Sequence, residues 1–394
     1  MTNKIGLFLI NPFLSAIVSL KNIRDGFSHK ILYAWFVVFG IGFCAVNESA
    51  DSFRYVENFK IECHYTWDRY VYEIKDWLSL EGSVGDVYTL TVNYLIGHFT
   101  ENYHWTFFLY AIVFGFFYIK SLKIFLKYSK NNDWLFYALL FLFCYSNPIF
   151  NINGVRFWTS AWIGVFVGLK LFVENEYKYL PLLLLMPIIH GSSVIWIGIM
   201  GVAWLTRYLQ NIWIALYIAS SFVSAVSYLH ILDNFSDMLP QFMQNKIWSY
   251  TQSDSAIERM KGISKEPTYS VFLMALPGYF GIVLCYLFIF NRKKINITYY
   301  KKNLLTVFLS LSAITNFFSS IPSFKRFASM VIPFMVIVWI QNIDVLKKYS
   351  YIFYLVPLIY AYSLLYWFRY MSSVTEIYLY LLPAPISIIK YLFF

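Results

Sequence analysis

The residue most suggestive of chemistry is a single arginine at the start of a strongly apolar run. Arg156 follows the polar turn Asn151-Ile152-Asn153-Gly154 and precedes the segment FWTSAWIGV. A guanidinium at the end of a membrane helix is costly unless an anionic group partners it. Its planar fork matches phosphate, and a helix start adds free N–H groups and a positive dipole. The pattern predicts a site for a phosphate or pyrophosphate carried on a lipid, with headgroup anchoring as the alternative.

A second polar turn is also followed by cations and an apolar run. Lys325 and Arg326 come after Ser319-Ser320-Ile321-Pro322-Ser323 and before FASMVIPFMVIVWI. Two such sites on one face of the protein would bracket a pyrophosphate. Anchoring to lipid headgroups is again the alternative for both side chains.

Two residues are candidates for the acid–base group. His190 lies between an apolar run and Gly191-Ser192-Ser193, and a neutral imidazole can act as a base or a hydrogen-bond donor. The alternative is a histidine satisfied by the neighbouring hydroxyls. Asp51 begins DSFRYVENF, where its carboxylate could deprotonate a hydroxyl, and Arg54 follows on the same helical face. The alternative for Asp51 is an exposed helix cap, and Glu48 is a weaker candidate for the same role.

The elements that must position these groups are membrane helices. Hydrophobic residues make up 59% of the 394-residue chain and charged residues only 13%, whereas soluble domains carry about 25% charged residues. Mean hydropathy is +0.56. We expect a single domain over residues 1–394, an all-α polytopic membrane protein with about 11–13 transmembrane helices. The expected spans are 5–20, 31–47, 104–124, 134–150, 156–173, 179–189, 191–206, 211–229, 269–290, 303–320, 327–341, 350–367 and a weaker one at 376–393.

The charges between these spans predict the orientation. The stretches 21–30, 120–130 and 291–302 are rich in Lys and Arg, which is typical of cytoplasmic loops. The stretch 48–86 is acidic, and the two long loops at about 48–103 and 230–268 are expected on the outer side. Treating 179–206 as a hairpin broken at His190 keeps 291–302 inside and puts His190 on the same side as Arg156, Lys325 and Arg326.

Several familiar signatures do not occur in the sequence. It contains no Walker A loop, no GxGxxG after a strand, no HExxH, no paired CxxC and no GxSxG. The net charge of +10 is explained by basic loops and not by nucleic-acid binding. We therefore expect no cofactor and no metal, and any energy for chemistry would already reside in the substrate.

Taken in order, the motifs resemble a known family. The segments INPFLSAIVSL, ILYAWFVVFGIGF, ADSFRYVENF, NGVRFWTSAWIGV, MPIIHGSS and SFKRFASMVIP are similar to those of the EpsG-like branch of Wzy-type polysaccharide polymerases. The resemblance implies a GT-C-like, metal-independent glycosyltransferase of the bacterial inner membrane. Such a polymerase joins undecaprenyl-pyrophosphate-linked oligosaccharide repeat units, as in O-antigen, at the periplasmic face. It further implies a separate chain-length regulator as a partner.

Carried over by motif, Arg156 is the arginine of NGVR, His190 is the motif histidine, and Lys325 and Arg326 are the late basic pair. Arg156, Lys325, Arg326 and Arg54 are expected to bind the pyrophosphate, and either His190 or Asp51 to be the base. An O-antigen ligase, which uses the same donor, and a lipid-linked oligosaccharide flippase are the alternative functions. A flippase should carry charges facing a central cavity in mid-span, whereas the candidate charges here cluster on one side.

Overall fold

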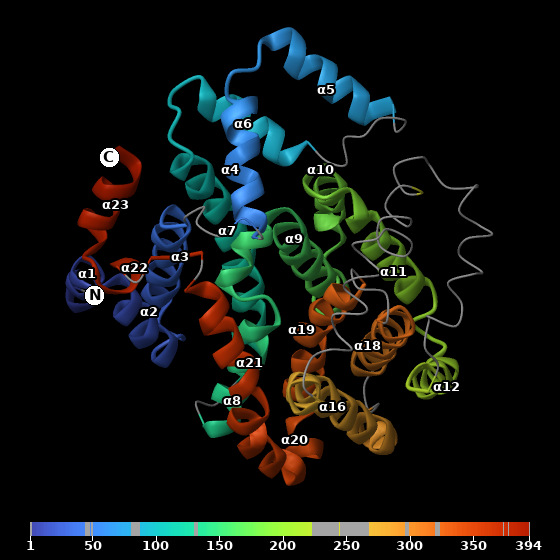
Figure 1. Cartoon of the computed structure of the whole chain (residues 1–394). Coiled ribbons are helices and arrows are strands. Elements are labelled where there is room, and N and C mark those ends of the chain that lie inside the picture. The colour runs from blue at the N-terminus through green and yellow to red at the C-terminus, as the bar shows by residue number, and fades with distance from the viewer. Residues whose placement is uncertain are drawn as a thin grey trace.

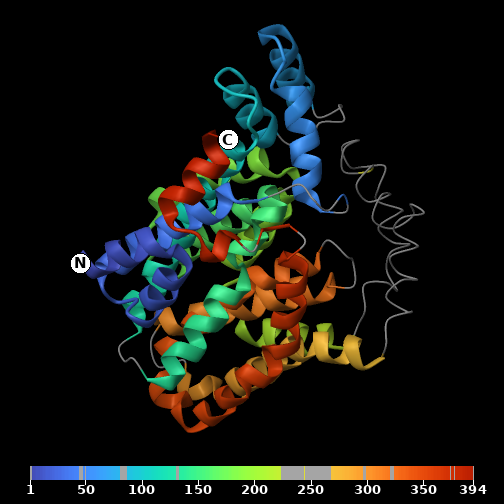
Figure 2. The ribbon, with the colours of Figure 1, turned by 60° about the vertical axis from the view of Figure 1, so that its left-hand side comes forward.

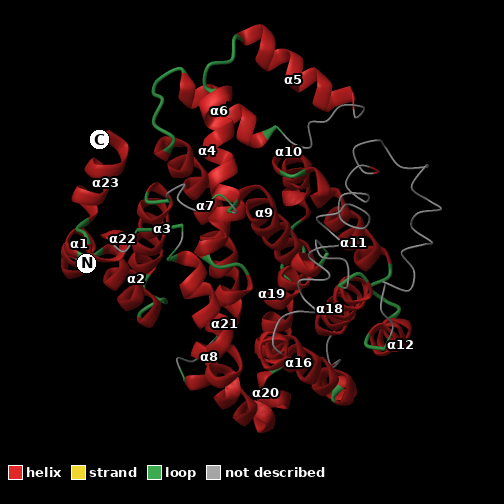
Figure 3. Ribbon diagram, in the orientation of Figure 1, coloured by secondary structure: helices red, strands yellow, loops and turns green. Residues whose placement is uncertain are grey.

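The computed structural model describes residues 2–43, 48, 50–79, 87–129, 133–222, 244, 268–295, 299–319, 324–372, 374–376 and 378–393. Helices dominate these ranges, and the described β-structure is an isolated bridge between Phe43 and Thr375 (Figure 3). The chain is an all-α polytopic membrane protein, as expected. Candidate spans long and apolar enough to cross a bilayer are His104–Tyr128, Trp134–Phe172, Tyr269–Phe290 and Ile343–Met371, together with shorter apolar helices.

The first half of the chain forms the helices that carry Asp51, Arg156 and His190. They are α1 (Thr2–Ile10), α2 (Pro12–Lys21), α3 (Gly26–Ile41), α4 (Asp51–Glu62), α5 (Trp67–Ser79), α6 (Tyr88–Gly97), α7 (His104–Tyr128), α8 (Trp134–Ser146), the 3-10 helix η1 (Ile149–Gly154), α9 (Val155–Phe172), η2 (Tyr177–Leu184), α10 (Leu185–Ile189), η3 (Gly191–Ser193), α11 (Val194–Leu205) and α12 (Gln210–Ser220).

The second half supplies the helices around Lys325 and Arg326. They are α16 (Thr268–Phe290), α17 (Arg292–Ile295), α18 (Tyr299–Phe317), α19 (Lys325–Gln341), α20 (Ile343–Leu346), η5 (Lys347–Leu355), α21 (Val356–Met371), α22 (Tyr378–Leu381) and α23 (Ala384–Phe393). The expected outer loop 230–268 lies outside the described residues except for Gln244 and Thr268.

Ion pairs define one end of the bundle, here called the basic end. Lys127 at the end of α7 and Lys170 near the end of α9 both contact the Glu174 carboxylate at 2.5 Å. Arg24, which follows α2, donates to the carbonyl of Ser129 at 2.8 Å. Because α9 ends here, its start lies at the opposite end, here called the site end. The α4–α6 segment extends beyond the site end, at the top of Figure 1.

The chain turns back at two predicted places. α8 begins shortly after α7 ends, so α8 and α9 run in opposite directions about η1 and correspond to the expected spans 134–150 and 156–173. At only 13 residues, α8 is about 20 Å long. The second reversal lies at His190, between α10 and α11, as the hairpin interpretation predicted.

The prediction of a single span at 5–20 is wrong. α1 and α2 meet at Asn11, whose side chain accepts a hydrogen bond from Leu14 N at 2.8 Å, with Pro12 in the first helical position. The Lys4 ammonium lies 2.6 Å from the Asp25 carboxylate, beyond the end of α2. The two helices therefore fold back on each other, and each is about 15 Å long, half of a hydrocarbon core of about 30 Å.

The weaker span at 376–393 is also two short helices, α22 and α23, separated near Pro383. A 2.5 Å ion pair between Glu376 and Lys390 joins the two ends of this segment. It packs against the N-terminal helices: Asn11 donates to the carbonyl of Tyr380 at 3.2 Å. The N and C labels accordingly both lie at the left in Figure 1, and in Figure 2 the red C-terminal helix lies beside the blue N-terminal helices.

Two glycines allow α9 to pack closely on the helices that carry the other site groups. A Cβ on Gly164 would lie 2.7 Å from the Trp196 ring of α11, and one on Gly168 would lie 2.6 Å from the Phe334 ring of α19. Small residues permit such close helix approach in membrane proteins. This close packing fixes the position of α9 relative to the segments that carry His190 and Arg326.

Candidate functional site

The polar turn before Arg156 is a closed network of amides. Asn147 donates to the carbonyl of Trp158 at 3.0 Å and accepts from the Asn151 amide at 2.8 Å. Its own carbonyl accepts from the Trp162 indole at 3.1 Å. η1 runs directly into α9, so α9 does not begin as the open helix end that the sequence suggested. The fork of Arg156, and not the amides of the turn, is what remains to recognise an anion.

Asn153 joins this turn to two other helices. Its side-chain oxygen accepts a hydrogen bond from Ser52 N at 3.1 Å, and its amide donates to the Tyr370 hydroxyl at 2.8 Å. Ala50, the residue before α4, has no capping side chain. Asn153 therefore caps α4 from a distant part of the chain and holds the start of α4 and the end of α21 beside η1.

Asp51 lies next to the same turn. A Cβ on Gly154 would lie 3.4 Å from Asp51 Oδ2, an ordinary contact distance, so the carboxylate lies directly beside Gly154. Asp51 forms an ion pair with Arg54, one helical turn along α4. The Asp51 side chain is 31% exposed and that of Arg54 is 70% exposed. The pair is thus open to solvent at the edge of the turn, and a substrate could reach it.

Arg156 is half-buried against Tyr55 of α4. Its Nε lies 3.4 Å from the Tyr55 hydroxyl, and its guanidinium lies 5.5 Å from the centre of the Tyr55 ring. This is a cation–π arrangement. Tyr55 is one helical turn beyond Asp51, so Arg156 contacts the same face of α4 that carries Asp51.

Phe157, the next residue, contacts both His190 and Arg326. The Phe157 and His190 ring centres are 5.6 Å apart at 85°, and the Arg326 guanidinium is 5.7 Å from the Phe157 ring. His190 has an extended backbone, and its carbonyl accepts from the N–H and the hydroxyl of Ser193 at 2.9 and 2.7 Å. Phe157 therefore links the α10–α11 turn to the start of α19.

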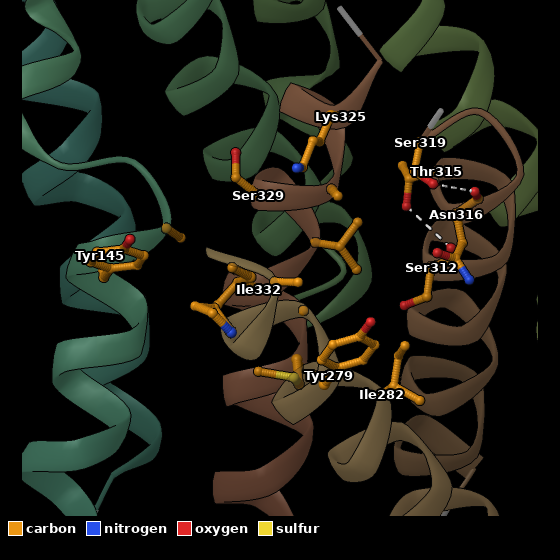
Figure 4. A pocket seen from close by; sticks show the side chains of 18 of the residues that line it. Tyr145, Tyr279, Ile282, Ser312, Thr315, Asn316, Ser319, Lys325, Ser329 and Ile332 are labelled. Carbon is orange, nitrogen blue, oxygen red and sulfur yellow. Dashed lines mark hydrogen bonds between the residues drawn. The ribbon is translucent and has the colours of Figure 1, made fainter. Parts of the chain in front are cut away.

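Trp158 points in a third direction, into a cavity of about 620 Å³ that Lys325 also lines. Successive residues of a helix are rotated by about 100°. Residues 156, 157 and 158 consequently contact α4, the His190–Arg326 pair and the cavity in turn. Figure 4 shows Lys325 at one end of that cavity.

All six sequence-predicted residues thus lie at the site end, in three adjoining groups and not in one cluster. The first group is Asp51, Arg54 and Arg156, which adjoin the turn. The second is His190 and Arg326, which both contact Phe157. The third is Lys325, which lines the cavity. Their chemical roles remain predictions. Across the described residues, no three His, Cys, Asp or Glu side chains gather as a metal site would require.

Sequence reasoning missed the aromatic and amide residues around Arg156. Tyr55 could have been found from its position one turn after Asp51, whereas nothing in the sequence pointed to Asn153 or Tyr370 as partners. Beyond Tyr55 lie the Tyr110 and Tyr88 rings, whose centres are 5.4 Å apart. Burial raises the pKa of the Tyr88 phenol.

Comparison with known proteins gives one family match. Residues 7–382 match the model described as the EpsG family, nearly the whole chain. No curated protein and no solved structure matches the chain. The match confirms the resemblance drawn from the motifs.

Proposed function

The chain belongs to the EpsG family, and from this premise we propose that it joins undecaprenyl-pyrophosphate-linked oligosaccharide units into an O-antigen-type polysaccharide. Family membership supports a polysaccharide-polymerase-like function in general; the donor, the product and the site are our proposal. The observation that carries it is the meeting of Arg326 and His190 on Phe157, the neighbour of Arg156. Groups suited to an anion and to a proton transfer thereby come together from three separate segments.

In this proposal the cations bind the donor pyrophosphate. Tyr55 lies against the Arg156 guanidinium and fixes its orientation. Arg326, exposed at the start of α19, and Lys325 beside it approach from another side. Arg54, which is mostly solvent-exposed, belongs to the outer edge of the same region. Charge-assisted bonds to phosphate are about twice as strong as neutral ones, and they strengthen as negative charge develops on the leaving group.

The reaction requires one nucleophile and one base. An acceptor hydroxyl attacks the anomeric carbon of the donor, and the bond from that carbon to the pyrophosphate oxygen breaks with its electron pair going to the pyrophosphate. The hydroxyl proton passes to His190 or to the Asp51 carboxylate. Direct attack from the opposite face predicts inversion at the anomeric carbon. Asp51 is paired with Arg54, whereas His190 contacts the same Phe157 ring as Arg326, and the choice between the two bases is left to experiment.

We place the chain in the bacterial inner membrane, as for the proposed polymerase, and the charge distribution supports an orientation with the site facing the periplasm. Arg24, Lys127 and Lys170 lie at the basic end, opposite Arg156. Cytoplasmic sides of membrane proteins carry an excess of Lys and Arg. The α4–α6 segment then extends into the periplasm, where the proposed chain-length regulator would act, while membrane lipids surround the bundle.

The test is a polymerisation assay with purified protein and lipid-pyrophosphate-linked repeat units. We expect a ladder of products for the wild type and a loss of at least about 100-fold for Arg156→Ala, the size of effect seen when one charge-stabilising donor is removed. Arg207→Ala is the matched control, because Arg207 also lies on aromatic rings, those of Trp204 and Tyr208, but at the other end of α11. Normal chain lengths in Arg156→Ala would refute the donor site.

The same assay distinguishes the other functions. Transfer of a single unit to a lipid A core acceptor without a ladder would indicate a ligase. Movement of lipid-linked units across vesicle membranes without new glycosidic bonds would indicate a flippase.

The base is identified by comparing His190→Gln with Asp51→Asn across pH 5–8. A histidine base gives a rate that rises near neutral pH, so His190→Gln should remove that rise as well as most of the rate. If Asp51 is the base, Asp51→Asn abolishes the rate and His190→Gln preserves the pH profile. Retention of more than half of the rate by both variants would exclude both assignments.

A further inference from the structure

The cavity beside Trp158 is an open one, lined mainly by residues of α16, α18, α19 and α21, with further residues from α8 and α12. Its volume of about 620 Å³ falls within the range of about 300–1,000 Å³ typical of small-molecule sites. Of its lining residues, the proposed function uses only Lys325. The remainder of the cavity has no assigned role.

The polarity of the lining changes from one end to the other. Figure 4 shows Lys325, Ser329 and Ser319 at one end, and Tyr279, Ile282 and Ile332 toward the other. Among the described lining residues Lys325 is the charged one, and none is acidic. The cavity therefore offers a cation at one end and, at the other, a largely apolar surface that includes the Tyr279 hydroxyl.

The hydroxyl groups near Lys325 already donate to their own helices. Ser329 donates to the carbonyl of Arg326 at 2.7 Å, Ser319 to that of Asn316 at 2.7 Å and Thr315 to that of Leu311 at 2.8 Å. Recognition of an anion in this cavity consequently falls on the Lys325 ammonium.

The α16 wall contains two glycines that helix packing does not explain. A Cβ on Gly278 or Gly281 would meet nothing within 4 Å, and both residues line the cavity. Glycine in a helix interior is less favourable than alanine. Nothing in the packing demands these glycines, but together with the Pro277 in the same helix they leave space on its cavity side.

α16 also separates the cavity from the bilayer. Its window of highest hydropathy is only 28% buried within the protein, and Phe272 and Val283 are 54% and 50% exposed. A ligand of this cavity therefore lies one helix away from the lipid.

We infer that this cavity binds the isoprenoid lipid of the donor, with its phosphate at Lys325 and the first part of its chain along the glycine face of α16. The inference rests on the proposed function, which supplies a lipid pyrophosphate at the same end of the bundle. Met274, Ile282, Ile332 and Met335 provide apolar lining that suits an isoprenoid chain, and burying the hydroxyls of a sugar against such a surface is costly.

The experiment measures binding of undecaprenyl pyrophosphate without any oligosaccharide, by native mass spectrometry of the purified protein. Gly281→Leu places a side chain in the cavity, and its Cβ would clash with no neighbouring atom. Lys325→Gln removes the positive charge. We expect each to weaken binding at least tenfold, and Lys325→Arg to retain it. Gly201→Leu is the matched control, because a Cβ on Gly201 also meets nothing within 4 Å and Gly201 does not line the cavity.

Two further arms identify the ligand. Phosphatidylglycerol, a bilayer lipid whose headgroup is a singly charged phosphodiester, should bind more weakly and be insensitive to Gly281→Leu. Inorganic pyrophosphate should be sensitive to Lys325→Gln only. Equal binding and equal sensitivity for phosphatidylglycerol would overturn the isoprenoid assignment, and wild-type binding by both Gly281→Leu and Lys325→Gln would overturn the site.

The outcome is separable from that of the proposed function. Variant-sensitive lipid binding without a polymer ladder would refute the polymerase and preserve the lipid site. A normal ladder from stably folded Gly281→Leu, with unchanged lipid binding, would refute the lipid site and preserve the polymerase.

Discussion

Replacing Asn153 with alanine is expected to weaken both the fold at the start of α4 and the proposed reaction. The side chain accepts from Ser52 N at 3.1 Å and donates to the Tyr370 hydroxyl at 2.8 Å. Ala50 cannot cap α4 in its place. The variant therefore deprives a buried amide in the first turn of α4 of this acceptor.

The magnitude follows from the two bonds. Loss of a helix cap costs about 0.5–2 kcal/mol, and loss of a second hydrogen bond about 0.5–1.5 kcal/mol. The expected decrease in the free energy of unfolding is about 2 kcal/mol. These bonds position the first turn of α4, which carries Asp51. If the full loss of about 2 kcal/mol also raised the energy of the transition state, the polymerisation rate would fall about 30-fold, at about 1.4 kcal/mol per factor of ten.

The assay compares Asn153→Ala with Tyr370→Phe in thermal unfolding and in polymerisation. Tyr370→Phe removes one acceptor but leaves Ser52 N bonded to Asn153, so its effect should be about 1 kcal/mol or less. If Asn153→Ala unfolds and reacts like the wild type, or if the two variants are equal, Asn153 does not position α4 and the reasoning is refuted.

Two further predictions concern stability. Gly97→Ala should lower the free energy of unfolding by about 1–3 kcal/mol, because the added Cβ would lie 2.3 Å from the backbone oxygen of Cys63. Gly198→Ala, whose Cβ meets nothing within 4 Å, should leave the melting temperature unchanged or raised, and equal melting of the two variants would contradict the packing argument. Hydrogen bonds from Lys390 and Tyr391 lower the pKa of Glu376 below its ordinary value of 4.5. Their contribution to the stability of the fold is therefore complete above pH 4.5 and is lost as the pH falls through the lower pKa of the folded state. Hydrogen exchange in α23 should therefore rise in acid for the wild type and be nearly pH-independent, after correction for intrinsic exchange, for Glu376→Gln; parallel profiles would argue against this pair.

The sequence was sufficient for the features that depend on local signals. Apolar runs interrupted by polar turns predicted the helices, and the turns before Arg156 and at His190 correspond to the reversals at η1 and between α10 and α11. The positions of Arg156, Lys325 and Arg326 at one end followed from the same signals and from the charge of the loops.

Other features depend on contacts between distant residues. Asn153 and Ser52 are 101 positions apart, and a single sequence gives no measure of which polar groups meet across such a distance. At the N-terminus the signal was present, because Asn11 followed by Pro12 is a typical helix cap and first residue. The length of the apolar run around it favoured a single span, and the structure shows that the local capping signal was decisive.

The contact between the N-terminal and C-terminal helices has a consequence for biogenesis. Asn11 donates to the carbonyl of Tyr380, 369 positions later. At synthesis rates of about 5–20 residues per second, this bond can form only about 20–70 s after Asn11 leaves the ribosome. During that interval the faces of α1, α2 and α3 that contact the α22–α23 segment are uncovered. Those helix faces are therefore exposed to bilayer lipid or to insertion factors until residues 376–393 arrive, and ribosome-arrested chains ending before residue 376 would present them in that state.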